Sequence, residues 1–373
     1  MKKDRKILLG IISLGLITRL FTLNFLQITD LSLNPLFISD ILGHPIIFSW
    51  WVNMVLGVGN IILIWLISSK LFSKRVALLS SFVYIASPWT AYIELSGTPY
   101  IALLFFTLLL FLGTILNHQK NKYGFILMSL SSFLLLSSSI FYLVILPVFF
   151  ITFNKGLQKS RGLQLVLVLS LSIILSVILT NKAAFINHFR SQLTIISDIG
   201  IVNSVNTFRG DVMKSELWFL GKIIENRYSY FSEKLVLNFL DQFSPTVYFT
   251  SQYKLLNFSF TPPIYLGFLL PFLFGFGQIF KSYQKYLRPA MLLLILTIPS
   301  VFSKGSPDLT RLIIFSPVVF IIIGLGLDNF YINKGNKIFK LLILITIILL
   351  SVQFLVTVSD IILREPMRLQ KFT

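Results

Sequence analysis

NKAAFINHFRSQLTIISDIGIVNSVNTFRG, residues 181–210, begins the long polar stretch of this chain, which continues to residue 261. The stretch carries eight basic and six acidic residues, whereas the whole 373-residue chain has only 14 acidic residues. Mixed, nearly balanced charge with interleaved aromatic residues is typical of a folded segment in water. We therefore expect three parts: an N-terminal transmembrane bundle (1–180) with a short external first loop, an external helical segment (181–261) and C-terminal transmembrane helices (262–373).

The overall composition is that of a membrane protein. Hydrophobic residues make up 55% of the chain, charged residues 12%, and the mean hydropathy is +0.83. A soluble protein has about 25% charged residues. We expect an all-α, polytopic membrane protein with about 11 transmembrane helices. The predicted spans are residues 7–26, 45–67, 76–93, 100–117, 163–180, 262–280, 290–302, 312–327 and 341–358, with two more between 124 and 153.

The segment Gly124–Phe153 has 30 residues and a basic residue near each end, so both ends belong on one side of the membrane. Two full spans of about 20 residues do not fit. We expect two short helices that meet near Ser137–Ser139, where serine hydroxyls satisfy backbone groups. The alternative is one long tilted span, which would place every later loop on the opposite side of the membrane.

The net charge of +18 is concentrated in six short segments between the predicted helices. They are residues 2–6, 70–75, 120–122, 155–161, 281–288 and 334–340, which hold 18 basic residues and one acid, Asp4. The positive-inside rule places them in the cytoplasm, with the N-terminus inside and residues 181–261 and the C-terminus outside. This charge contacts anionic lipid head groups rather than nucleic acid. We expect a multi-pass integral membrane protein with its N-terminus in the cytoplasm.

The first span starts from a basic end, but we expect a membrane span there rather than a signal peptide, because no small-residue cleavage site follows and Arg19 interrupts the run. Arg19 should face protein, since a lipid-facing charge costs several kcal/mol. In the external segment, residues 215–224 and Tyr230–Phe243 are predicted helices. Phe243-Ser-Pro245 should end the second one, and the aromatic-rich Thr246–Phe260 should lie at the membrane surface.

Candidate catalytic residues lie on the predicted external side. Asp40 is in the 19-residue first loop, with Asp30 and His44 nearby. A carboxylate at the membrane rim is a candidate general base for an acceptor hydroxyl. Solvated loop acids are the alternative interpretation. Glu94, at the end of the third span, is a further candidate, or else a solvated carboxylate at a helix end.

A cationic cluster precedes a late span. Lys304, Asp308 and Arg311 fall in the sequence Ser303-Lys-Gly-Ser-Pro-Asp-Leu-Thr-Arg311. An arginine at the membrane edge can bind a phosphate with two parallel hydrogen bonds. The alternative is an arginine that only anchors the helix at the interface.

Other site types are not supported by the sequence. The histidines His44, His118 and His188 fall in different loops and form no zinc motif. The sequence has no GxxxxGK[ST] or GxGxxG phosphate loop and no GxSxG elbow. ATP-driven transport and serine hydrolysis are therefore unsupported.

Several short motifs, in their order along the chain, resemble one family. They are Thr18-Arg19-Leu20 closing the first helix, Ile61–Arg75 followed by Ala77–Pro88 and Trp89, Ser197–Gly210, Asn226–Phe249, and Pro307-Asp-Leu-Thr-Arg311 followed by Pro317 and Gly324-Leu-Gly326. Together they resemble the GT-C class of polytopic glycosyltransferases, the group of protein O-mannosyltransferases and lipid-A aminoarabinose transferases, especially the bacterial relatives.

The resemblance implies a cell-envelope enzyme of the bacterial plasma membrane that moves a sugar from a polyprenyl-phosphate donor to a glycan, lipid or protein acceptor on the external face. It implies Asp40 as the base and Arg311 with Lys304 as ligands of the donor phosphate. A divalent metal is left open. The chain departs from the family pattern, because Asp40 is followed by Ile41 instead of a second acid, and Asp308 stands where a histidine is common. The alternatives are a catalytically degenerate relative and a transporter or flippase of lipid-linked sugars.

Overall fold

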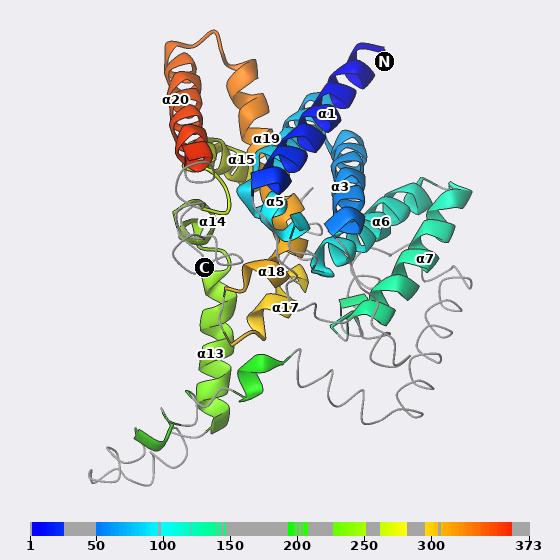
Figure 1. Cartoon of the computed structure of the whole chain (residues 1–373), viewed down its shortest axis with the longest axis vertical. Coiled ribbons are helices and arrows are strands. Elements are labelled where there is room, and N and C mark those ends of the chain that lie inside the picture. Colours follow the sequence, from blue (N-terminus) through cyan, green and yellow to red (C-terminus); the bar gives the residue numbers. More distant parts are fainter. Residues whose placement is uncertain are drawn as a thin grey trace.

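The computed structural model describes residues 2–25, 50–95, 98–119, 121–139, 141–142, 145–146, 193–197, 200, 203, 205–207, 227–250, 262–281, 295–304 and 307–359. These residues form helices, turns and bends, with no strand among them, so the predicted all-α class is confirmed for this part of the chain (Figure 1).

The helices of the N-terminal part are α1 (Lys2–Phe25), α3 (Trp50–Leu71), α4 (Lys74–Ala86), α5 (Pro88–Leu95), α6 (Tyr100–His118) and α7 (Lys122–Ser138). The C-terminal part has η3 (Leu266–Phe268), α15 (Leu269–Lys281), α17 (Ile298–Val301), α18 (Leu309–Leu312), η4 (Ile313–Phe315), α19 (Ser316–Ile332) and α20 (Lys337–Ser359). Between them lie η2 (Thr194–Ser197), α13 (Arg227–Asp241) and α14 (Pro245–Phe249).

The chain is an integral membrane protein. Within the described ranges, four helices are long and apolar enough to cross a membrane, or five if α4 and α5 count as one bent span. Three shorter apolar helices cover Lys6–Ile17, Tyr123–Leu136 and Leu266–Lys281. The total of 11 spans stays a prediction.

The two transmembrane parts pack on each other through α4 and α19. Gly324 of α19 lies against Ser80 of α4 so closely that a Cβ would overlap the serine. On another side of α19, Gly275 and Gly326 let the α15 and α19 backbones touch. Small residues allow such close contact between membrane helices.

The predicted span 76–93 is wrong as a single helix. The chain breaks at Ser87, and α4 and α5 diverge by 61°. Pro88 explains the break, because proline has no N–H for the preceding turn and forces Ser87 into an extended conformation. The Ser87 hydroxyl donates instead to the carbonyl of Pro263, at 2.9 Å.

The other predicted break, at Ser137–Ser139, is present. Helix α7 ends at Ser138, and Ser139 is extended, with φ −156° and ψ 137°. The Ser138 hydroxyl donates to the carbonyl of Leu134 at 2.5 Å, in the way expected for a serine near a helix end. The rest of the predicted second helix lies largely outside the described residues.

In the polar segment, the predicted helix Tyr230–Phe243 is confirmed as α13, with its end two residues earlier. Asn238 holds it to the bundle by donating to the carbonyl oxygens of Val301 and Ser303. The predicted helix 215–224 lies outside the described residues. Helix α1 ends at Phe25, within one residue of the predicted end of the first span, so Thr18-Arg19-Leu20 lies inside this helix rather than at its end.

The start of the aromatic-rich stretch Thr246–Phe260 is buried in the protein. Pro245 starts α14, whose Val247, Tyr248 and Phe249 are buried in the main core. The Tyr248 ring centre lies 5.9 Å from that of Trp89 on α5. The expected surface location is therefore wrong for these three residues, and residues 251–261 lie outside the described part of the chain.

Candidate functional site

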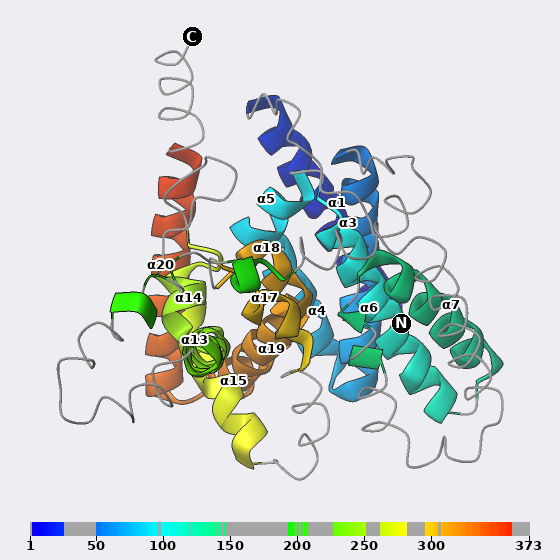
Figure 2. The same ribbon diagram turned by 90° about the horizontal axis from the view of Figure 1, so that it is seen from below.

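The candidate site is built where α5, α6, α17 and α18 meet, below the middle of the view in Figure 1 and at the centre of Figure 2. The indole nitrogen of Trp89 on α5 donates to the carbonyl of Leu309 on α18, at 2.9 Å. The backbone nitrogen of Trp89 donates to the carbonyl of Pro263. Trp89, fully buried, therefore joins three distant segments of the chain.

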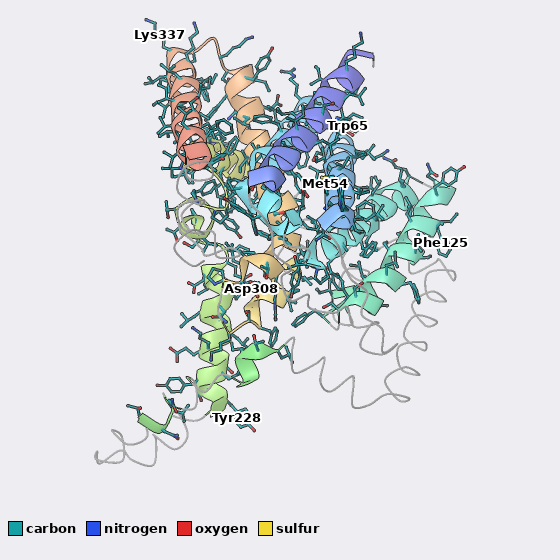
Figure 3. All side chains as sticks on the ribbon, viewed as in Figure 1. Met54, Trp65, Phe125, Tyr228, Asp308 and Lys337 are labelled. Atoms are coloured by element: carbon teal, nitrogen blue, oxygen red, sulfur yellow. The ribbon has the colours of Figure 1, made fainter. Side chains whose placement is uncertain are left out.

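Asp308 organises the turn that carries Arg311. Its carboxylate caps α18 by accepting from the backbone nitrogens of Thr310 (3.0 Å) and Arg311 (3.3 Å). The other carboxylate oxygen accepts from the Ser303 hydroxyl at 3.2 Å. The Asp308 backbone nitrogen donates to the Ser300 hydroxyl. Figure 3 labels Asp308 at this junction of α17 and α18.

Arg311 is buried, with 7% of its surface exposed, and its guanidinium group is held from several directions. Nε lies 3.1 Å from Oδ2 of Asp308, but its N–H is not aligned for a hydrogen bond, so this contact is an ion pair. Nη1 donates to the carbonyl of Pro299 at 3.4 Å. The guanidinium group also hydrogen-bonds to the Tyr100 hydroxyl on α6. A buried arginine fixed in this way presents a planar fork in one orientation.

Lys304 lies at the rim of the same turn. It follows Ser303, which contacts Asp308, and its side chain is exposed. The Lys304 backbone nitrogen donates to the Thr194 hydroxyl of η2 at 2.9 Å, which fixes the backbone here. The structure therefore pairs Asp308 with Arg311 and fixes the backbone at Lys304, and a shared phosphate site for Lys304 and Arg311 stays a prediction.

Glu94 is a separate, fully buried carboxyl group on α5. It accepts a hydrogen bond of 2.7 Å from the Tyr84 hydroxyl, which in turn accepts one from Asn60 at 3.3 Å. Its carboxyl group packs on Gly57 of α3 so closely that a Cβ at that position would overlap it. The interpretation of Glu94 as a solvated helix end is therefore wrong, because α5 turns back toward α3. An ionisable residue inside a transmembrane bundle is a candidate functional group.

The remaining predicted site residues are Asp30, Asp40 and His44. They lie outside the described residues, so the pairing of Asp40 with Arg311 stays a prediction. In the described part of the chain, no group of three or more Asp, Glu or His side chains is placed to hold a metal ion.

Sequence reasoning missed Tyr100, Trp89 and Ser303 as site residues. Trp89 and Tyr100 each stand beside a proline at the start of a helix, and such a position brings a side chain to the end of a bundle. That signal locates a helix start but does not identify a neighbour on α18.

The sequence of the chain matches no protein family model and no curated protein. Among solved structures, it is similar to the apo form of the oligosaccharyltransferase of Archaeoglobus fulgidus, with a TM-score of 0.50 and 15% identity over 94% of this chain and 55% of that one. Two further structures of the oligosaccharyltransferase from this organism have TM-scores of 0.46. One, named AglB, is in complex with an inhibitory peptide and a dolichol-phosphate, with 15% identity over 92% of this chain and 55% of that one. The other is tethered to an acceptor peptide containing the NVT sequon, with 14% identity over 92% and 54%. The chain thus spans about half the length of these proteins, and the first match shows a likeness of fold.

Proposed function

We infer that this protein is a membrane glycosyltransferase that moves a sugar, of the hexose or mannose kind, from a polyprenyl-phosphate donor to an acceptor on the external face. The observation that carries this proposal is the fixed Arg311 at the start of a transmembrane span, with Lys304 exposed beside it. The finer relationship, to the O-mannosyltransferases and aminoarabinose transferases, rests on the sequence motifs. The oligosaccharyltransferase fold match supports a sugar-transfer role at a membrane.

The proposed chemistry is a single inverting displacement. A carboxylate takes the proton of the acceptor hydroxyl as its oxygen attacks the anomeric carbon. The bond from that carbon to the phosphate oxygen breaks, and its electron pair leaves with the lipid phosphate. Asp40 is the proposed base. Arg311 and Lys304 stabilise the charge that develops on the departing phosphate, because fixed donors need no reorganisation during the reaction.

The lipid tail of the donor lies in the bilayer. Its phosphate lies at the end of the span where Arg311 is located. The acceptor is a glycan, a lipid or a protein, which approaches from the side of the polar segment.

A second candidate is a relative that has kept the scaffold and lost transfer. The ion pair between Arg311 and Asp308 favours it, because part of the arginine charge is already neutralised where a histidine is common in the family. One observation favours the transporter alternative. Glu94 is buried, so the bundle contains an ionisable group besides Arg19. The helix break in α4–α5 is the further feature that such a transporter would need.

A transfer assay with a polyprenyl-phosphate sugar tests the proposed roles. Asp40→Asn should lower the rate by about 10²–10⁴-fold, which is the usual contribution of a general base. Arg311→Ala should raise the donor KM and lower kcat, and Arg311→Lys should restore only part of the loss, because lysine lacks the planar fork.

Lys304→Gln tests the same phosphate site at an exposed position, where folding should not depend on the side chain. Lys340→Gln, far along the chain on α20, is the matched control and should leave transfer unchanged. Activity that survives Asp40→Asn unchanged would exclude Asp40 as the base. Absence of transfer with every polyprenyl donor in the folded protein would favour the degenerate relative.

A further inference from the structure

We propose that the opposite end of the bundle holds a binding site for the head group of an anionic phospholipid, formed by Arg75, Tyr331 and Lys334. We call these three residues the cation–aromatic site. The sequence predicts only that scattered basic residues lie near lipid head groups, whereas the structure selects two of them and places them on one ring.

The geometry of the cation–aromatic site is specific. The guanidinium carbon of Arg75 lies 5.2 Å from the centre of the Tyr331 ring, and Nζ of Lys334 lies 4.3 Å from the same centre. Both distances are within the range of cation–π attraction. Arg75 comes from the first turn of α4 and Lys334 from the turn after α19, so the site joins two distant parts of the chain.

The turn that carries Lys334 is held by its own hydrogen bonds. The backbone nitrogen of Asn336 donates to the carbonyl of Asn333, and the Asn336 side chain caps α20 by accepting from Ile338 at 2.9 Å. The Asn333 side chain donates to the carbonyl of Asn329, also at 2.9 Å. The lysine therefore projects from a defined backbone.

Arg75 and Lys334 carry like charges and repel each other beside the Tyr331 ring. The carboxylate of Asp328 offsets only part of this repulsion. Asp328 lies 3.8 Å from Arg75, which is beyond hydrogen-bond distance. The Arg75 side chain remains 58% exposed. A phosphate group beside the ring would add charge-assisted hydrogen bonds to both cations and remove the repulsion.

The location favours a lipid over a free phosphate. Tyr331 is in the last turn of the apolar helical run Leu309–Ile332, and α20 begins the next span at Lys337. Tyrosine at the end of a span lies at head-group level. Ile332 and Ile338, exposed by 63% and 64%, flank the site and offer an apolar surface to the acyl chains below a bound phosphate. Free phosphate would make no use of these side chains.

The cation–aromatic site is distinct from the candidate transfer site. Arg311 and Tyr331 are at the two ends of one apolar helical run, and 20 residues of helix correspond to about 30 Å. In Figure 3, Lys337 beside the proposed lipid site is at the top of the view, far from Asp308. The proposal therefore does not depend on the glycosyltransferase assignment.

The test uses the full chain in a neutral detergent, with dioleoylphosphatidylglycerol added as the probe and the rise in the unfolding midpoint as readout. Arg75→Gln with Lys334→Gln should weaken binding by more than about tenfold, because each change removes a charge-assisted hydrogen bond to the phosphate. Tyr331→Leu should weaken binding by about threefold, whereas Tyr331→Phe, which keeps the ring face, should bind as the wild type does. Each variant is compared with the wild type in dioleoylphosphatidylcholine to check its folding.

Lys70→Gln with Lys340→Gln is the matched control, because it removes the same charge without touching the ring. Retained binding in this control supports a defined site, and an equal loss in both double variants would overturn it in favour of diffuse attraction. A midpoint rise of the same size with inorganic phosphate would overturn the lipid assignment. Unchanged phosphatidylglycerol affinity in Arg75→Gln with Lys334→Gln would refute the site altogether.

Discussion

At the scale of single residues, Glu94 and Gly57 depend on each other. The carboxyl group of Glu94 occupies the space where any side chain at position 57 would lie. The Tyr84 hydroxyl donates to this carboxyl group at 2.7 Å, and the Asn60 side chain donates in turn to the Tyr84 hydroxyl at 3.3 Å. Burying a carboxyl group is costly unless it is hydrogen-bonded. Glycine at position 57 leaves the space in which Glu94 makes its hydrogen bond.

Gly57→Ala should therefore destabilise the protein by about 1–3 kcal/mol, because the new methyl group forces the Glu94 side chain out of its hydrogen bond. Denaturant unfolding in micelles measures this. Gly277→Ala on α15 is the control, since no atom lies within 4 Å of a Cβ there, and it should be neutral or slightly stabilising. Combining Gly57→Ala with Glu94→Ala should cost less than the sum of the two single changes. A fully additive pair would contradict the contact.

At the scale of elements, the short helix α5 connects the two transmembrane parts. Trp89 in its first turn contacts both Pro263 and Leu309, so α5 fixes the turn that orients Arg311. Trp89→Phe keeps most of the buried ring but removes the N–H donor. We expect a loss of about 1 kcal/mol in the free energy of unfolding, the usual net contribution of one hydrogen bond.

Trp51→Phe provides the comparison for this change, because the Trp51 side chain on α3 is largely exposed in the structure. Its substitution should change the free energy of unfolding by less than about 0.5 kcal/mol. Equal effects of the two substitutions would mean that ring size, and not the bond to Leu309, accounts for the Trp89 effect.

The elements also show what the sequence can and cannot predict. Apolar runs locate α3, α6, α19 and α20 within a few residues, because lipid requires long uninterrupted apolar helices. The bend at Ser87 was missed, because the run of hydrophobic residues continues through Pro88 whereas the helix is interrupted there. The burial of Tyr248 and Glu94 was missed for a related reason, because both depend on where α5 points after that bend. The pairing of Asp308 with Arg311 could be expected from the sequence because the two residues are three positions apart.

At the scale of the whole molecule, charge is sorted between two ends. The basic segments 70–75 and 334–340 meet at the cation–aromatic site. Figure 1 shows the start of α1, which is formed by the basic segment 2–6, at the same end as the α19–α20 turn. Helix α13 extends beyond the other end. The positive-inside rule uses only the sequence, so this spatial sorting is an independent reason to expect one orientation.

Cysteine labelling tests that orientation, and the chain offers a clean background because it contains no cysteine. Tyr228→Cys on α13 and Gly335→Cys in the α19–α20 turn both place a thiol at an exposed position. We expect a membrane-impermeant maleimide to modify Tyr228→Cys in intact cells and to reach Gly335→Cys only after permeabilisation. The physical reason is that lysines beside position 335 are retained on the cytoplasmic side during insertion, whereas the nearly balanced charge around position 228 is not. Modification of Gly335→Cys from outside would reverse the topology and place Arg311 on the cytoplasmic face, where an external acceptor could not reach it.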